Sequence, residues 1–113
     1  MPAFEPWDVV KVPYPYTNRP ATEHRPALVV ARIAEGPGLL WVLMITSAAN
    51  RAWPCDVPIS DLGAAGLPVP SVVRTAKIAT IDTALATRLG ALPLADRQTV
   101  GDMLTGRLPV TDR

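Results

Sequence analysis

Two polar groups stand at the ends of apolar segments near the middle of this chain of 113 residues. Arg25 opens the apolar run 26–30, while Thr46 and Ser47 close the run 44–45. If the two runs are neighbouring strands, a guanidinium and two hydroxyls lie at one rim of a small β-structure. Such a rim can bind an anion, and it can stabilise the charge that develops during phosphoryl chemistry.

The elements that would position these groups are short strands. β-branched and apolar residues between polar or Pro/Gly-rich breaks predict five of them, at Trp7–Tyr14, Pro26–Ile33, Leu39–Thr46, Cys55–Ile59 and Ser71–Ile81. The second and third strands are expected to form a hairpin through the turn 35–38. A polar loop is expected at 17–23, another loop at 48–54, and a Gly/Pro-rich loop at 63–70.

The last third of the chain predicts helix. Asp82 or Thr83 could cap a short helical turn that runs through Leu89. A final helix is expected from about 93–96 to Gly106, with Gly106 as its C-cap. Its apolar stripe would consist of Leu94, Val100, Met103 and Leu104. The expected fold is mainly β with α: a small barrel or strongly bent sheet with one terminal helix.

Composition limits the classes of function. The length suits a single domain, 1–113, and the 49% apolar fraction supports a real core. A net charge of +1 argues against a broad basic nucleic-acid surface but leaves room for a local one. One cysteine, Cys55, and one histidine, His24, cannot build a Cys/His zinc site within one chain, and no metal or cofactor is expected. No leader or membrane-length apolar run is seen, which favours a cytoplasmic protein.

Several strings, in this order, resemble the MazF/PemK-like toxins of type II toxin–antitoxin systems. The resemblance covers most of the chain and rests on the ordered set, because no single string is specific. The strings are Asp8-Val9-Val10 with the segment 12–17, Arg25-Pro26, Ile45-Thr46-Ser47 with Asn50, Gly66-Leu67, Ser71-Val72-Val73-Arg74 and Thr80-Ile81-Asp82.

The resemblance implies a fold and an activity. The fold would be an SH3-like small barrel of the MazF/PemK/CcdB type with a C-terminal helix. The protein would be a homodimer that cleaves single-stranded RNA without a metal and is neutralised by a cognate antitoxin protein. By matching motifs, the catalytic pair is Arg25 and Thr46, and in one branch Arg74 also acts.

Two departures from the family pattern stand out. Trp7 occupies the place where the family usually has glycine, before the first Asp-Val pair. Ala76 occupies the place where the branch with the second arginine has an aspartate. The missing carboxylate leaves open which group moves the proton.

The expected chemistry is attack of the RNA 2′-hydroxyl on the adjacent phosphorus, which gives a 2′,3′-cyclic phosphate and a 5′-hydroxyl. A guanidinium can hold two phosphate oxygens, so Arg25 is the first choice for charge stabilisation and Arg74 the second. Thr46 would orient the phosphate. RNA contacts are expected from Ser47, Asn50, Trp53, His24 and Lys77.

Each residue also has a purely structural interpretation. In that interpretation the sole role of Arg25 is an ion pair with Glu23 or Asp8, and the sole role of Thr46 and Ser47 is to cap a turn. Arg74 would then lie on a solvated strand face, and His24 in a loop. Tyr14, Tyr16, Trp41 and Trp53 could all stack on bases, although the apolar neighbours of Trp41 favour the core and the loop around Trp53 favours exposure. Asn50 is either a turn residue or a reader of base edges.

Two other functions remain open at this point. A gyrase poison such as CcdB shares the expected fold, acts through its C-terminal helix and would not need Arg25. The polar end Thr111-Asp112-Arg113 does not support that function. A degenerate member that only binds RNA or an antitoxin is compatible with Ala76.

Overall fold

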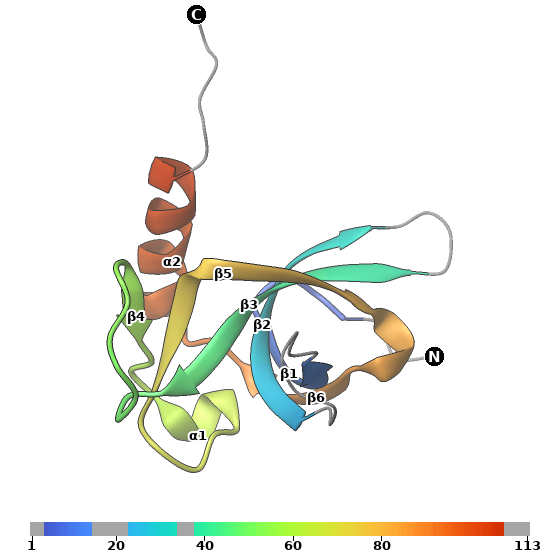
Figure 1. Ribbon diagram of the computed structural model, residues 1–113, viewed down its shortest axis with the longest axis horizontal. Coiled ribbons are helices and arrows are strands. Elements are labelled where there is room, and N and C mark those ends of the chain that lie inside the picture. Colours follow the sequence, from blue (N-terminus) through green and yellow to red (C-terminus); the bar gives the residue numbers. More distant parts are fainter. Residues whose placement is uncertain (1–3, 15–22, 34–37, 108–113) are drawn as a thin grey trace, which may run out of the picture.

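The chain folds into one strongly bent, six-stranded antiparallel sheet with a helix at its C-terminal end (Figure 1). The structure is a computed structural model and describes residues 4–14, 23–33 and 38–107. The elements are β1 (Asp8–Tyr14), β2 (Glu23–Ile33), β3 (Leu39–Ser47), β4 (Asp56–Pro58), α1 (Leu62–Ala65), β5 (Ser71–Asp82), the 3-10 turn η1 (Thr83–Leu85), β6 (Thr87–Ala91) and α2 (Leu94–Arg107).

The strands lie in the order β4-β5-β3-β2-β1-β6, so β4 and β6 form the two edges and the barrel is open. Irregularities in register bend the sheet between Val9 and Val10, between Val29 and Ala31, and between Leu43 and Met44. The last of these is the largest, because β5 carries three extra residues between the partners of Leu43 and Met44, which are Ile78 and Arg74.

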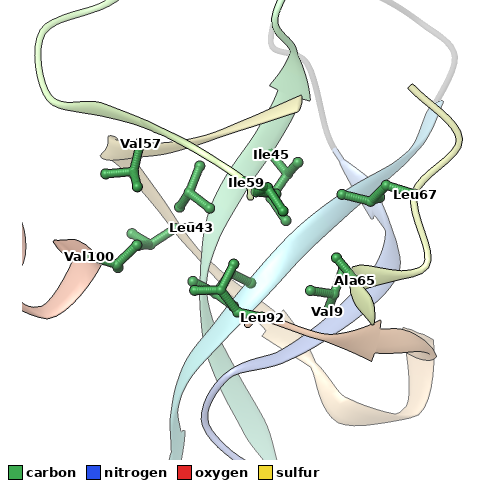
Figure 2. Packing of buried hydrophobic residues seen from close by; sticks show 11 residues of the cluster. Val9, Leu43, Ile45, Val57, Ile59, Ala65, Leu67, Leu92 and Val100 are labelled. Atoms are coloured by element: carbon green, nitrogen blue, oxygen red, sulfur yellow. The ribbon is translucent and has the colours of Figure 1, made fainter. Parts of the chain in front are cut away.

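Each face of the sheet carries its own hydrophobic cluster. One lies between the sheet and the two helices (Figure 2); its fully buried members include Val9, Leu28, Leu43, Ile45, Val73, Leu92 and Val100. The other lies on the opposite face under Phe4; its members include Val10, Val12, Ala27, Val29, Leu40, Val42, Met44 and Ile81. Because side chains alternate along β2 and β3, each of these strands contributes residues to both clusters. Their sequences are therefore continuous apolar runs.

Two glycines let α1 pack closely against β6. Gly66 ends α1 with a φ of +73°, and a Cβ there would collide with the backbone carbonyl of Leu89. A Cβ on Gly90 would collide with the backbone of Ala64 and Ala65. Trp7 adopts a φ of +80°, the left-handed region that favours glycine, at the position where the family pattern usually has one.

The strand pattern is confirmed, with boundaries that shift by a few residues. β2 begins at Glu23 rather than Pro26, so Arg25 lies within a strand. Two expectations for the segment 62–91 are wrong. The helix α1 overlaps the start of the expected loop 63–70, and the helical turn stops at Leu85 instead of running through Leu89, because Thr87–Ala91 is the edge strand β6. Asp82 does cap η1, since its Oδ1 accepts a hydrogen bond from the backbone N–H of Ala84 at 2.9 Å.

Other errors concern single side chains. Trp41 is 46% exposed rather than core, because the end of the β2–β3 hairpin extends beyond the cover of the helices. Leu94 is 77% exposed and so does not belong to the apolar stripe of α2, whereas Val100 is buried. Gly106 lies inside α2 rather than at its cap.

The expected turn at 35–37, most of the loop 17–23 and Tyr16 lie outside the described residues. Within the described ranges, no helix is both long and apolar enough to cross a membrane.

Candidate active site

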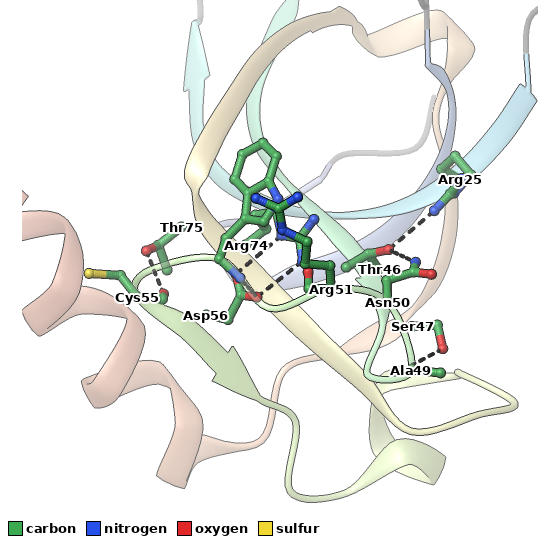
Figure 3. A network of polar contacts seen from close by, with 11 residues as sticks. Arg25, Thr46, Ser47, Ala49, Asn50, Arg51, Cys55, Asp56, Arg74 and Thr75 are labelled. Carbon is green, nitrogen blue, oxygen red and sulfur yellow. Dashed lines mark hydrogen bonds and ion pairs between the residues drawn. The ribbon is translucent and has the colours of Figure 1, made fainter.

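The predicted convergence of a guanidinium and a hydroxyl is present. Ala27 of β2 lies opposite Met44 of β3. Continuing this antiparallel register by two residues sets Arg25 opposite Thr46, with both side chains on the same face of the sheet. Arg25 Nη2 donates a hydrogen bond to Thr46 Oγ1 at 3.3 Å (Figure 3).

The two groups differ in their access to solvent. Thr46 is only 4% exposed, whereas the Arg25 side chain retains 28% of its surface. Arg25 Nη1 also lies 3.4 Å from Glu23 Oε1, two positions earlier on the same face of β2. The pairing of Arg25 with Glu23 is therefore real, and it coexists with the contact to Thr46. Asp8, the other candidate partner, instead pairs with Arg88 at 3.2 Å.

Asn50 joins this pair from the turn that follows β3. Its Nδ2 donates to Thr46 Oγ1 at 2.6 Å, so the hydroxyl receives hydrogen bonds from two residues. The turn itself is closed by Ser47, whose carbonyl accepts from the N–H of Asn50 and whose Oγ accepts from the N–H of Ala49. Ser47 thus caps a turn, as its structural interpretation predicts.

Arg74 lies on the same face, opposite Met44 on β3 and Asp56 on β4. Its guanidinium forms a two-point ion pair with Asp56, at 3.2 Å from Nε to Oδ1 and 3.1 Å from Nη2 to Oδ2. Nη2 also donates to the carbonyl of Arg51 at 2.8 Å. The two side chains are 9% and 11% exposed, so the interpretation of Arg74 as a solvated strand residue is wrong.

Trp53 lies over this ion pair. The centroid of its ring is 4.4 Å from the Arg74 guanidinium carbon and 5.7 Å from Lys77 Nζ. Trp53 itself is 39% exposed, as its loop position predicted. A half-exposed ring that contacts two cations offers both a stacking surface and positive charge, the combination that single-strand binders use.

His24 is the candidate that the structure separates from the rest. It lies on β2 rather than in a loop, and it is exposed. Because neighbouring side chains alternate along a strand, His24 points to the face opposite Arg25 and Thr46.

Within the part of the chain that the structure describes, no group of three or more His, Cys, Asp or Glu residues could hold a metal ion.

Asp56 is the residue that sequence reasoning missed. The sequence shows no carboxylate at position 76, yet Asp56 supplies one to Arg74 from the neighbouring strand. Asp56 is the second residue of the predicted short strand Cys55–Ile59, and a carboxylate on a strand is a signal that could have found it. However, its partner depends on the register between β4 and β5, and no local pattern specifies that register.

The site therefore combines two arginines, a hydroxyl and an aromatic ring on one face of an open β-barrel. Groups of these kinds can bind a polyanion and stabilise negative charge, which are the two requirements of a phosphate-binding site. A family model described as "PemK-like, MazF-like toxin of type II toxin-antitoxin system" matches residues 5–105. The chain belongs to this family.

Solved structures agree on the fold. A MazE–MazF complex from Deinococcus radiodurans (Form II) is similar with a TM-score of 0.71 and 23% identity, over 98% of this chain and 100% of that chain. An endoribonuclease in complex with its cognate antitoxin, from a mycobacterial species, is similar with a TM-score of 0.71 and 20% identity, over 96% of this chain and 99% of that chain. The Mycobacterium tuberculosis toxin MazF-mt6 is similar with a TM-score of 0.65 and 20% identity, over 90% of this chain and 94% of that chain.

The expected fold class, mainly β with a C-terminal helix of the MazF/PemK type, is confirmed by these likenesses. A search of curated proteins returned no match.

Proposed function

We propose that this chain is the toxin of a type II toxin–antitoxin system and acts as a metal-independent endoribonuclease on single-stranded RNA. The observation that carries the proposal is the contact of Arg25 Nη2 with Thr46 Oγ1 at 3.3 Å. Membership of the toxin family supports the same activity, and so does the likeness to a structural neighbour that is an endoribonuclease.

In the reaction, the 2′-hydroxyl oxygen attacks the adjacent phosphorus. A bond from phosphorus to O2′ forms and the bond from phosphorus to O5′ breaks, giving a 2′,3′-cyclic phosphate and a 5′-hydroxyl. Negative charge grows on the non-bridging oxygens as the attack proceeds. Arg25 neutralises this charge, and Thr46 donates its hydroxyl proton to the same phosphate, so no metal ion is needed.

Glu23 takes the proton of the attacking 2′-hydroxyl in this proposal. Its carboxylate lies against Arg25, whereas His24 points to the other face. The departing 5′ oxygen takes a proton from water. In this chain Ala76 stands where one branch of the family has an aspartate, and Glu23 would supply the carboxylate that is missing there.

Arg74, Trp53 and Lys77 extend the site along the RNA. Three N–H groups of Arg74 are used by Asp56 and the Arg51 carbonyl, and its two Nη1 N–H groups make no hydrogen bond within the described ranges. These two remain available for a phosphate. Trp53 would stack on a base, and Lys77 would contact the backbone.

The partners follow from the same assignment. A cognate antitoxin protein would bind the toxin and block the site; among the structural neighbours, one is a complex of MazE with MazF and another is an endoribonuclease bound to its cognate antitoxin. We place residues 1–113 in a single toxin domain that acts in the cytoplasm as a homodimer, since two-fold dimers are the commonest assemblies.

The test is incubation of the purified protein with a long single-stranded RNA in excess EDTA. Cleavage is expected, with 5′-hydroxyl and cyclic phosphate ends, and the Arg25→Ala variant should leave the RNA intact. RNA that stays whole at high protein excess would refute the nuclease activity, and tight binding without new ends would indicate a binding protein instead.

A further inference from the structure

The hydroxyl of Thr46 has no free acceptor capacity. A hydroxyl has one proton to donate and two lone pairs that accept. Thr46 Oγ1 accepts from Asn50 Nδ2 at 2.6 Å and from Arg25 Nη2 at 3.3 Å. Both lone pairs are therefore used, and the only further hydrogen bond that this hydroxyl can make is one that it donates.

The side chain of Asn50 is not needed to form its own turn. The N–H of Asn50 donates to the carbonyl of Ser47 at 3.0 Å, and the N–H of Ala48 donates to the carbonyl of Pro70 at 2.9 Å. A third bond joins the N–H of Ala49 to Ser47 Oγ at 3.1 Å. Asn50 is an exposed residue, yet its amide turns toward Thr46 rather than toward solvent.

We infer that Asn50 is a positioning residue for Thr46: its amide occupies an acceptor site of the hydroxyl and thereby directs the Thr46 proton toward the substrate phosphate. The inference rests on the proposed function and assigns Asn50 a role distinct from turn formation and from reading base edges. Without Asn50, the hydroxyl is free to rotate, to accept a hydrogen bond from water or to donate away from the phosphate.

The orientation of the Asn50 amide carries the inference. If its oxygen faced Thr46, the hydroxyl would donate to Asn50 and would lose its proton for the substrate. Asn50→Asp imposes this second state, because an ionised carboxylate only accepts hydrogen bonds. Asn50→Leu keeps a similar branched shape and removes the donor, so it leaves the hydroxyl without direction.

The experiment measures single-turnover cleavage rates at saturating protein on an RNA whose cleavage site has been mapped with wild-type protein. We expect Asn50→Leu to slow cleavage by about tenfold to a hundredfold, the range that misplacement of a catalytic group produces. Asn50→Asp should be slower still. Ala49→Gly, which loosens the same turn and keeps the Asn50 amide, should stay within about twofold of wild type.

Two further readouts separate positioning from binding and from stability. Affinity for the same RNA with a 2′-deoxynucleotide before the scissile phosphate should be unchanged within about twofold in Asn50→Leu. In a Thr46→Val background, Asn50→Leu should have no further effect on the rate, because the hydroxyl that it directs is absent. Asn50→Ala repeats the series if the leucine variant unfolds.

Three results would overturn the inference. One is a wild-type rate in Asn50→Leu and Asn50→Ala; another is an equal loss of rate in the Thr46→Val background. The third is a loss confined to affinity, which would make Asn50 a base-edge reader. If the wild-type protein cleaves no RNA, the proposed function itself fails and the inference fails with it.

Discussion

Removing Asp56 should destabilise the protein far more than removing an ordinary surface charge. The Arg74 side chain is 9% exposed in the wild type, and the Asp56→Ala variant leaves its guanidinium with the Arg51 carbonyl as the one remaining hydrogen-bond acceptor among the described residues. Breaking one side of a buried ion pair costs about 3 to 5 kcal/mol, because the other charge stays buried and unpaired. We expect about 3 kcal/mol, the lower end, since Asp56 keeps 11% of its side-chain surface.

The assay is thermal unfolding followed by circular dichroism at fixed protein concentration. For a chain of this size, 1 kcal/mol corresponds to about 4 °C, so Tm should fall by about 12 °C in Asp56→Ala. The double variant Asp56→Ala/Arg74→Met removes the orphaned charge as well. It should recover at least half of the loss, because replacing both partners by apolar groups is often close to neutral.

Two outcomes would refute this reasoning. A Tm within about 3 °C of wild type in Asp56→Ala would mean that water solvates Arg74 and that the pair is not a buried one. The other is a double variant whose Tm falls below that of Asp56→Ala by about as much as Asp56→Ala falls below wild type. This result would mean that the two residues contribute independently to stability.

Three further predictions concern the site and the packing beneath it. Arg25→Lys should lower the single-turnover cleavage rate by about a hundredfold to a thousandfold, because an ammonium cannot reproduce the two-point hold of a guanidinium; a change below about fivefold would contradict its role. Glu23→Gln should lower the rate by about a hundredfold or more without weakening RNA affinity, and an unchanged rate would exclude it as proton acceptor. Gly90→Ala should lower the free energy of unfolding by about 2 to 3 kcal/mol in urea denaturation, since the new Cβ collides with the backbone of α1. The control is Gly101→Ala, which meets nothing within 4 Å and should stabilise by about 0.5 to 1 kcal/mol; equal effects at the two glycines would contradict the packing.

The placement of Arg25 and Thr46 was predictable because it depends on local patterns. Each residue adjoins an apolar run, and the turn-forming residues between the runs favour a hairpin. A hairpin brings the start of its first strand beside the end of its second. The contact between the two side chains then needed only the correct register.

The partners of Arg74 were not predictable in the same way. Strict alternation along β5 would place Val73, Thr75 and Lys77 on one face, but the three extra residues opposite the step from Leu43 to Met44 break the alternation. The register of β4 against β5, which brings Asp56 to Arg74, is likewise set by tertiary packing rather than by local propensity.

The sequence-based predictions for the segment of β6 and for the burial of Trp41 are wrong for related reasons. Thr87–Ala91 contains Arg88 and Gly90 and has weak strand propensity. It is nevertheless a strand, because its backbone pairs with the otherwise open edge of β1. Trp41 belongs to an apolar run in which each residue looks buried. Its exposure depends on how far the helices extend over the sheet, and the sequence of β3 carries no information on that.

The central claim is that Arg25 and Thr46 act together on one phosphate, and a double-variant cycle on the cleavage rate tests it most directly. Groups that act as a unit lose most of their effect when either is removed. We therefore predict that Arg25→Ala/Thr46→Val cleaves RNA no more than about threefold more slowly than the slower single variant. Losses that multiply, so that the double variant shows the product of the two single effects, would mean that the two side chains act on separate parts of the reaction and would contradict the account.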